Sequence, residues 1–170
     1  MNKQQVRTFR ANGGEQEKGL LDLIKRIKRK DLVIVEIGSA YGESAEVFLS
    51  TGKVKQVICV DPWRDSEREP FFDKRFENEP RIKKVRGASE EVAKRFPDNR
   101  YDLIYIDAIH TKEGVLRDIK NYQRTLKKGG WIGGHDYVPN FQGVIDAVNE
   151  TYGEKNVIKF CDGSWLVKLK

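Results

Sequence analysis

Short apolar runs alternate along the chain with segments of helical period. The apolar runs are rich in valine and isoleucine, which is typical of strands buried on both faces of a parallel sheet, and they occupy residues 31–38, 54–61, 81–87, 101–107 and 131–136. Amphipathic segments that indicate helices follow at residues 43–52, 89–96, 112–130 and 141–153. Strands that alternate with helices predict an α/β fold with a doubly wound, mostly parallel sheet.

The C-terminal segment, residues 156–170, has a different pattern. It holds two apolar runs separated by Asp162-Gly163, a dipeptide that strongly favours a tight hairpin turn. Together with the five preceding strands, this pair predicts a seven-stranded sheet that ends in a C-terminal antiparallel hairpin.

Two segments lack a clear period. Residues 66–80 contain Pro70 and Pro80, so we expect only part of this connection to be helical. Glycines near the N-terminus indicate a flexible arm over residues 1–19, which leaves a single domain over residues 20–170.

The composition favours a soluble globular domain. The chain has 170 residues, of which 34% are charged and 38% hydrophobic, and no apolar run approaches the roughly 18 residues of a membrane span. The N-terminal residues lack the apolar core of a signal peptide, so a cytoplasmic location is expected. Cys59 and Cys161 both fall in strand-like runs and are predicted to be buried thiols in a reducing compartment.

The net charge is +6, which favours anionic partners, nucleic acid among them. The densest basic cluster is Lys25–Lys30, with the sequence KRIKRK, at the end of a helical pattern. Cations at a helix C-terminus interact favourably with the helix dipole, so a solvated helix end is the simpler interpretation of this cluster.

A glycine turn follows the first predicted strand in the sequence VEIGSAYGESAEVF, residues 33–46. Gly38 and Gly42 allow a tight turn into a helix N-terminus, where backbone amides point at a bound ligand. The spacing G-x-x-x-G matches neither the dinucleotide fingerprint nor a P-loop. Asp61 ends the second strand, where a carboxylate can accept hydrogen bonds from both hydroxyls of a ribose.

Glu36 lies near the end of a strand that is otherwise apolar. A buried carboxylate without a partner is unfavourable, so this residue is expected to be paired or to bind a ligand. It would repel a dinucleotide phosphate and tolerate a cationic amino-acid end or a sulfonium. The residue therefore favours S-adenosylmethionine over NAD as the cofactor.

This stretch resembles motif I of the class I S-adenosylmethionine-dependent methyltransferases, most closely the small-molecule O-methyltransferase branch that includes catechol O-methyltransferase. The matching residues are Glu36, Gly38, Gly42, Ser44 and Ala45, and Ala40 stands where the commoner form has a third glycine. The resemblance extends over residues 30–170 through further matches in the expected order: Asp61, Gly87-Ala88-Ser89, YDLIYIDAIH (101–110) and LKKGGWI (126–132). It implies a Rossmann-like methyltransferase fold.

The resemblance also assigns residues to the cofactor. The methionine part would lie over Gly38, Ser39, Ala40, Tyr41 and Gly42, with Glu36 and Ser44 beside it. Asp61 would hold the ribose, and Ala88 and Ser89 would line the adenine, Ser89 also being expected to cap a helix. Trp63 would either flank the adenine or pack in the core.

Both histidines of the chain, His110 and His135, come at the carboxyl ends of adjacent predicted strands, each near an aspartate. Ligands bind at that edge of a doubly wound sheet, and an imidazole can take a proton near neutral pH. Metal-dependent O-methyltransferases carry Asp-x-x-Lys at this point, matched here by Asp107 and His110. By the resemblance, Asp107 is a metal ligand or contacts the cofactor, and His110 is the general base.

The second half of that metal site matches only in part. The family has Asp-Asn after strand five, whereas this chain has Asp136-Tyr137. His135 is an alternative ligand, or the base in place of His110. Two carboxylates and water suit Mg²⁺, whereas histidine ligands would also accept Zn²⁺, Mn²⁺ or iron. The sequence leaves open whether a divalent cation is required, and whether Tyr137 closes the substrate pocket or packs.

The expected function is methyl transfer from S-adenosylmethionine to a hydroxyl of a small molecule such as a sugar or another hydroxylated metabolite. Alternatives are an RNA methyltransferase, which would use the positive charge, and a non-catalytic module that binds the cofactor. The absence of Asn/Asp-Pro-Pro-Tyr/Phe after Asp107 argues against methylation of exocyclic base nitrogens. Three aromatic residues between positions 64 and 80 would form an acceptor lid, a homodimer contact or a small satellite core: Phe71, Phe72 and Phe76.

Overall fold

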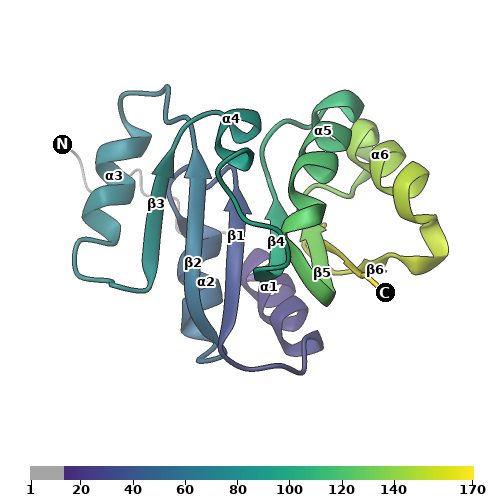
Figure 1. The fold of residues 1–170 in the computed structure, drawn as a ribbon, viewed down its shortest axis with the longest axis horizontal. Coiled ribbons are helices and arrows are strands. Elements are labelled where there is room, and N and C mark those ends of the chain that lie inside the picture. The colour runs from purple at the N-terminus through teal and green to yellow at the C-terminus, as the bar shows by residue number, and fades with distance from the viewer. Residues whose placement is uncertain (1–13) are drawn as a thin grey trace.

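The computed structural model describes residues 14–170, which form one seven-stranded sheet with helices on both faces (Figure 1). The strands are β1 (Leu32–Ile37), β2 (Val54–Asp61), β3 (Ile82–Arg86), β4 (Tyr101–Ile106), β5 (Leu126–Gly134), β6 (Ile158–Lys159) and β7 (Trp165–Lys168). The helices are α1 (Glu15–Arg26), α2 (Glu43–Ser50), α3 (Arg68–Arg75), α4 (Ser89–Ala93), α5 (Lys112–Tyr122) and α6 (Gln142–Tyr152). Short 3-10 turns lie at Gln123–Thr125, Pro139–Phe141 and Glu154–Asn156.

The strand order β3-β2-β1-β4-β5-β7-β6 confirms the predicted sheet. The first five strands in this order are parallel, and β7 pairs antiparallel with both β5 and β6. The chain order reverses between β1 and β4, and folds of this kind bind ligands at the carboxyl ends of the two strands at such a point. Glu36 of β1 stands there between Cys59 of β2 and Tyr105 of β4.

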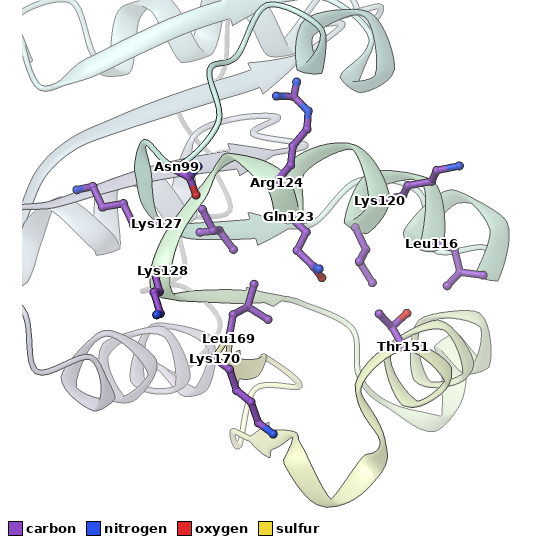
Figure 2. Close-up of a pocket in the computed structure, with 12 residues that line it drawn as sticks. Asn99, Leu116, Lys120, Gln123, Arg124, Lys127, Lys128, Thr151, Leu169 and Lys170 are labelled. Carbon is purple, nitrogen blue, oxygen red and sulfur yellow. The ribbon is translucent and has the colours of Figure 1, made fainter.

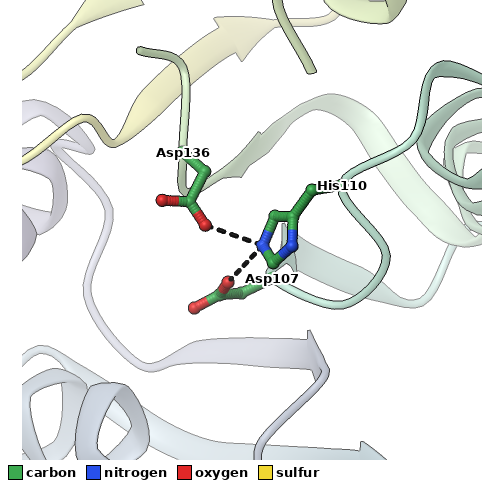
Figure 3. Close-up of side chains that lie close together, drawn as sticks. All are labelled: Asp107, His110 and Asp136. Atoms are coloured by element: carbon green, nitrogen blue, oxygen red, sulfur yellow. Dashed lines mark ion pairs between the residues drawn. The ribbon is translucent and has the colours of Figure 1, made fainter. Parts of the chain in front are cut away.

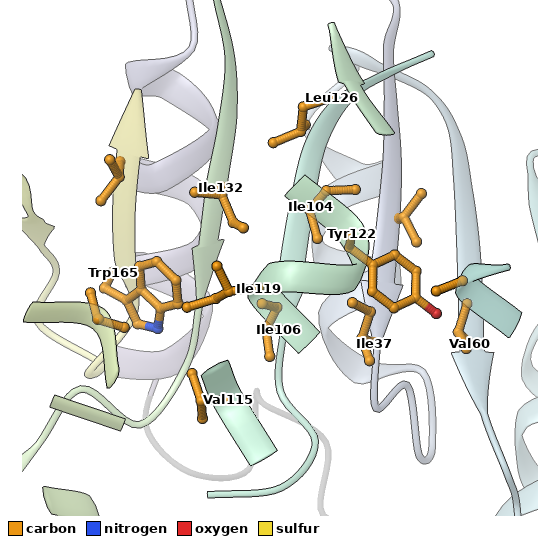
Figure 4. Packing of buried hydrophobic residues seen from close by; sticks show 14 of the residues in the cluster. Ile37, Val60, Ile104, Ile106, Val115, Ile119, Tyr122, Leu126, Ile132 and Trp165 are labelled. Atoms are coloured by element: carbon orange, nitrogen blue, oxygen red, sulfur yellow. The ribbon is translucent and has the colours of Figure 1, made fainter. Parts of the chain in front are cut away.

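Apolar side chains cover both faces of the sheet. On one face, residues of α4, α5 and α6 pack on the strands, with Tyr122 and Trp165 fully buried (Figure 4). On the other face, α1 and α2 bury side chains such as Leu23 and Phe48. Because both faces are covered, the central strands β1 and β4 are mostly apolar, and polar side chains gather where the strands end.

Helix α1 begins earlier than the sequence indicated. Gly14, with φ 81°, precedes the helix, so Glu15 to Gly19 are helical although they were predicted as part of the arm; residues 1–13 of that arm lie outside the described residues. Gly19 is buried against the β6–β7 turn, because a Cβ atom there would lie 2.0 Å from Asp162 Oδ1. This contact anchors the start of the helix.

The fifth strand also begins earlier than predicted. The Lys-Lys-Gly sequence after Leu126 was expected to end a helix over 112–130, but α5 ends at Tyr122 and β5 starts at Leu126. Leu126 pairs with Tyr101 of β4 and is 4% exposed. Strand pairing and burial therefore override the local helix-end pattern.

The irregular segment after β2 contains α3. Pro70 lies in its first turn, where no backbone donor is needed. Phe72 is 1% exposed and its ring centroid lies 4.9 Å from those of Trp63 and of Phe76. Of the three roles left open for these aromatics, the structure places Phe72 in the core.

The two cysteines differ. Cys59 is buried in β2 as expected, but the prediction that Cys161 is buried is wrong, because Cys161 is exposed in the turn that joins β6 to β7. Both are free thiols. None of the helices in residues 14–170 has the length and apolar character that a membrane crossing requires.

Candidate active site

The glycine turn after β1 needs glycine for two separate reasons. Gly38 has φ 91°, and a Cβ atom there would lie 2.0 Å from the backbone oxygen of Asp107. Gly42, with φ 80°, precedes α2, and a Cβ atom there would lie 2.3 Å from the ring of Phe76. The turn is therefore packed directly against the end of β4.

Asp61 at the end of β2 holds this turn in place. Its carboxylate accepts hydrogen bonds from the backbone N–H of Ala40 at 3.0 Å and of Trp63 at 2.7 Å. The Trp63 indole, 2% exposed, donates to the Ala40 carbonyl at 2.9 Å, so its ring packs in the core beneath the turn. Each Asp61 oxygen keeps a second lone pair with which it can accept a ligand hydroxyl.

Glu36 is 0% exposed and lacks a charged partner within the described chain. Its Oε2 is 3.6 Å from the Cys59 thiol, while its Oε1 and the Ser39 hydroxyl have no hydrogen-bond partner among residues 14–170. Burial raises the pKa of Glu36 to about 7, partly offset by the Ser44 hydroxyl. Unpaired buried oxygens beside a glycine turn fit a ligand whose cationic end supplies the missing donors.

Ser89, in the segment after β3, is held by hydrogen bonds to α5. The Ser89 hydroxyl donates to Asp118 of α5 at 2.6 Å, and the Ser89 carbonyl accepts from Tyr122 at 2.8 Å. Ser89 is the first residue of α4 and its side chain makes no capping hydrogen bond, so the predicted cap is wrong. Ala88 precedes the helix and is exposed.

Two histidines and three aspartates gather at the carboxyl edge of β4 and β5, and Figure 3 shows three of these residues, Asp107, His110 and Asp136. His110 Nε2 lies 2.7 Å from Asp136 Oδ2 and 3.7 Å from Asp107 Oδ1. His135 is more buried than His110, with Nδ1 at 3.1 Å from Asp136 Oδ1 and Nε2 at 3.9 Å from Asp162 Oδ2. The sequence predicted that four of these residues would meet, and the fifth, Asp162, arrives from the hairpin turn.

The strand ends place this cluster beside the glycine turn. The Asp107 N–H donates to the Ile37 carbonyl at 2.8 Å, and the His135 N–H donates to the Ile106 carbonyl at 3.1 Å. Sheet pairing thus continues just past the strands and sets Asp107 next to β1. Asp136 adopts φ 61°, a conformation that aspartate tolerates better than most residues.

The carboxylates favour charged imidazoles. The pKa of His110 is raised above 6.5, mainly by Asp107 and further by Asp136. Burial lowers the pKa of His135, but Asp136, Asp107 and Asp162 together raise it to about 9. Burial in turn raises the pKa of Asp136, but the two histidines outweigh it and leave that pKa below 3.8.

One atom each of Asp107, His110 and Asp136 lies within 4.8 Å of the other two, a spacing that could hold a metal ion. The 2.7 Å contact between His110 Nε2 and Asp136 is an ion pair without hydrogen-bond alignment. Carboxylate and imidazole donors suit Mn²⁺, Zn²⁺ or Fe²⁺, and two carboxylates with water suit Mg²⁺. The residues therefore fit a divalent cation.

Two exposed apolar side chains border the cluster and were not singled out from the sequence. The Phe141 ring stacks on the His110 imidazole at 4.7 Å between centroids with an interplanar angle of 37°. Phe141 is 36% and Ile109 48% exposed. Ile109 could have been identified from the sequence, because it is an apolar residue directly before His110 in the stretch DAIH. Tyr137, in contrast, is 9% exposed and donates to Asn149, so it packs against α6.

Comparison with known proteins agrees with the fold and the motif. The methyltransferase domain family matches residues 35–137, more than half of the chain. The uncharacterized protein R132 of Acanthamoeba polyphaga mimivirus is 28% identical over 130 residues, which cover 69% of this chain and 57% of R132. The present chain thus spans little more than half the length of that curated relative.

Solved structures share the fold at low sequence identity. A candidate caffeoyl-CoA O-methyltransferase from Staphylococcus aureus superposes with a TM-score of 0.69 at 18% identity, covering 91% of this chain and 82% of its own. Phosphoethanolamine N-methyltransferase 1 from Haemonchus contortus, solved with S-adenosylhomocysteine, gives a TM-score of 0.58 at 16% identity, with 72% and 26% covered.

The family match supports S-adenosylmethionine as the cofactor, and the solved structures agree with the fold. The chain belongs to the methyltransferase domain family.

Proposed function

We propose that the chain transfers a methyl group from S-adenosylmethionine to a hydroxyl group of a small molecule, and that His110 accepts the hydroxyl proton. The main support is the position of the His110 imidazole, between Asp107 and Asp136 and at the edge where Gly38 meets β4. Carboxylates on both sides stabilise the imidazolium that forms. The bound cofactor supplies an activated sulfonium methyl, so positioning and proton removal remain for the protein.

The residues that contact the cofactor are assigned from the glycine turn and its neighbours. Glu36 receives the amino group of the methionine part, because its Oε1 is buried without a donor. Backbone groups from Gly38 through Gly42 contact the rest of the methionine part, and Ser44 lies beside it at the start of α2. Asp61 accepts hydrogen bonds from the ribose hydroxyls. The backbone at Ala88 lines the adenine, because the Ser89 hydroxyl is bonded to Asp118.

The acceptor binds on the exposed side of His110. Phe141 and Ile109 offer an apolar border there, and Asp107 and Asp136 offer acceptors for additional hydroxyls. A sugar or another small hydroxylated metabolite with one apolar face suits this combination.

Calorimetric titration with S-adenosylhomocysteine tests the cofactor assignment. The unmodified protein should bind it, and Asp61→Asn should weaken binding at least about tenfold, because the loss of one good hydrogen-bonded charge is worth at least about 1.4 kcal/mol. Asp65→Asn, an exposed aspartate in the following loop, is the matched control and should bind normally. The assignment fails if the unmodified protein shows no heat at millimolar ligand.

Turnover of a panel of sugars and phenols, followed by release of S-adenosylhomocysteine, tests the base. His110→Gln should lower kcat by about 10² or more while cofactor affinity stays within about twofold. His135→Gln distinguishes the two histidines, since His135 is more buried than His110 and should have the smaller effect on kcat. The reverse ranking would move the base to His135.

A second candidate role for the same residues is to hold a divalent cation, which the 4.8 Å grouping of Asp107, His110 and Asp136 favours. Such a cation would stabilise the deprotonated hydroxyl of the acceptor. Titration with MnCl₂ or MgCl₂ should then release heat that Asp136→Asn abolishes. Full turnover after dialysis against EDTA would contradict a metal requirement and leave His110 as the base.

A further inference from the structure

A basic groove lies at the amino edge of the sheet, away from the candidate active site. Its volume is about 770 Å³, and it is bordered by α5, the end of α6, the start of β5 and the residues that follow β7 (Figure 2). The cluster around His110 lies past the carboxyl ends of β4 and β5, at the opposite edge.

The lining of this groove is positive. Twelve residues line it, none of them acidic, and the cations among them are Lys120, Arg124, Lys127, Lys128 and Lys170. Arg124 pairs with Asp98 and Lys127 with Asp102. For the other three lysines, the described part of the chain contains no ion pair. Their charge is therefore available to a ligand.

The groove continues into the basic segment after α1. The carboxylate of Asp102 accepts from Lys127 at 3.0 Å and from Arg29 at 2.6 Å, so these two cations lie side by side although they are far apart in the sequence. We call the combined surface the basic edge: Arg29, Lys120, Arg124, Lys127, Lys128 and Lys170.

We propose that the basic edge binds the phosphate backbone of single-stranded nucleic acid. A band of like charges drawn from separate segments suits a linear polyanion, whose repeated phosphates can meet each cation in turn. None of the residues that line the groove is acidic, and the two aspartates beside it, Asp98 and Asp102, are each paired with a cation. The proposal goes beyond methyl transfer, since a strand held here lies at the far edge from His110 and serves as a tether.

The apolar part of the groove argues against an acidic amphipathic peptide. Ile119 and Leu126 are 3% and 4% exposed, and only Leu116 and Leu169 are partly accessible. A docked helix needs a continuous apolar strip for its anchor residues, which this floor does not provide. No aromatic residue lines the groove either, so binding should be insensitive to base sequence.

Fluorescence anisotropy with a labelled oligouridylate of about 16 nucleotides, titrated at about 50 to 200 mM NaCl, tests the proposal. Log affinity should fall linearly with log salt. The triple variant Lys120→Glu/Lys128→Glu/Lys170→Glu should lose at least about tenfold in affinity, and its salt slope should be shallower by about 2, from about 0.7 per cation.

A charge-matched control separates the basic edge from net charge. Lys18→Glu/Lys74→Glu/Lys83→Glu changes three lysines exposed elsewhere, and both triple variants bring the net charge from +6 to zero. The control should bind the oligonucleotide several-fold more tightly than the groove variant. An equal loss in both variants, or no binding by the unmodified protein at low salt, would overturn the proposal.

Two further arms complete the test. Polyglutamate and duplex DNA serve as competitors, and equal competition by polyglutamate would overturn the assignment to nucleic acid. Titration of the groove variant with S-adenosylhomocysteine should match the unmodified protein, which shows that the variant is folded. If the unmodified protein does not bind S-adenosylhomocysteine, the proposed methyl transfer is contradicted, but the conclusion about oligonucleotide binding is unaffected.

Discussion

Two buried carboxylates on neighbouring strands, Glu36 of β1 and Asp102 of β4, have opposite surroundings. Asp102, 3% exposed at the amino edge, accepts from the Val33 N–H at 3.0 Å and pairs with Arg29 and Lys127. Glu36, 0% exposed at the carboxyl edge, has no cation beside it and lies near only neutral groups, the Cys59 thiol and the Ser44 hydroxyl. The first carboxylate is satisfied within the fold, whereas the second is left for a ligand.

The pKa shifts follow this difference. Burial raises the pKa of Glu36 to about 7, because no cation offsets it. Burial also acts on Asp102, but the Val33 N–H, Lys127 and Arg29 outweigh it and lower the pKa below 3.8. Compensation of a buried charge therefore identifies a structural site, and its absence identifies a binding site.

The largest effect is expected from Gly38→Ala at the carboxyl edge. The new methyl would lie 2.0 Å from the Asp107 backbone oxygen and φ is 91°, so both a clash and backbone strain follow. We expect a loss of at least about 3 kcal/mol in urea denaturation and no binding of S-adenosylhomocysteine. Gly129→Ala at the amino edge is the control, since φ is 70° there but nothing lies within 4 Å. It should cost about 1 kcal/mol; equal losses would mean that strain alone acts.

The basis of these contrasts was only partly readable from the sequence. The strand pattern, Glu36 and Asp61 were visible because a buried parallel strand is apolar throughout, so a carboxylate at its end stands out. The start of β5 at Leu126 was not visible in the sequence, because it depends on pairing with Tyr101, a residue distant in the chain. Asp162 joins the site through the hairpin turn, and the basic edge joins segments remote in sequence. The KRIKRK cluster was visible, but that it would meet Lys127 was not, because this contact is made only in the fold.

Glu36→Gln should show the next largest effect, and it depends on pH. The folded pKa of about 7 exceeds the ordinary value of 4.5, so the folded protein keeps this proton where the unfolded chain loses it. Ionised Glu36 thus costs stability that grows as pH rises from 4.5 through 7, up to about 3 kcal/mol at pH 8.

Urea denaturation of the Glu36→Gln protein should therefore show a gain relative to the unmodified protein that increases from pH 5 to pH 8. The same variant should bind S-adenosylmethionine more weakly, because the amino group loses its anionic partner. A stability difference that does not change with pH would contradict the uncompensated charge.

Asp102→Asn should give the smallest of the three effects and the opposite pH dependence. Loss of the paired charge is expected to cost about 2 kcal/mol at pH 7, without a change in cofactor affinity. Because the folded pKa is depressed, this contribution is present above pH 3.8 and disappears as pH falls through the folded value. Asp98→Asn, an exposed partner of Arg124 at the same edge, should stay within about 0.5 kcal/mol. A cost at pH 3 equal to that at pH 7 would refute the role of the ion pairs.

The two thiols differ in accessibility, and this difference makes the opening rate of the central strands measurable. Burial raises the pKa of Cys59 well above 9.0 and leaves it inaccessible in β2, whereas Cys161 is exposed. An alkylating reagent such as iodoacetamide should modify Cys161 at once and Cys59 only when β2 separates from its neighbours. Because Cys59 lies beside Glu36, the rate of the second alkylation reports on the strands around this carboxylate, and if Glu36 binds the cofactor as proposed, a bound cofactor should slow it.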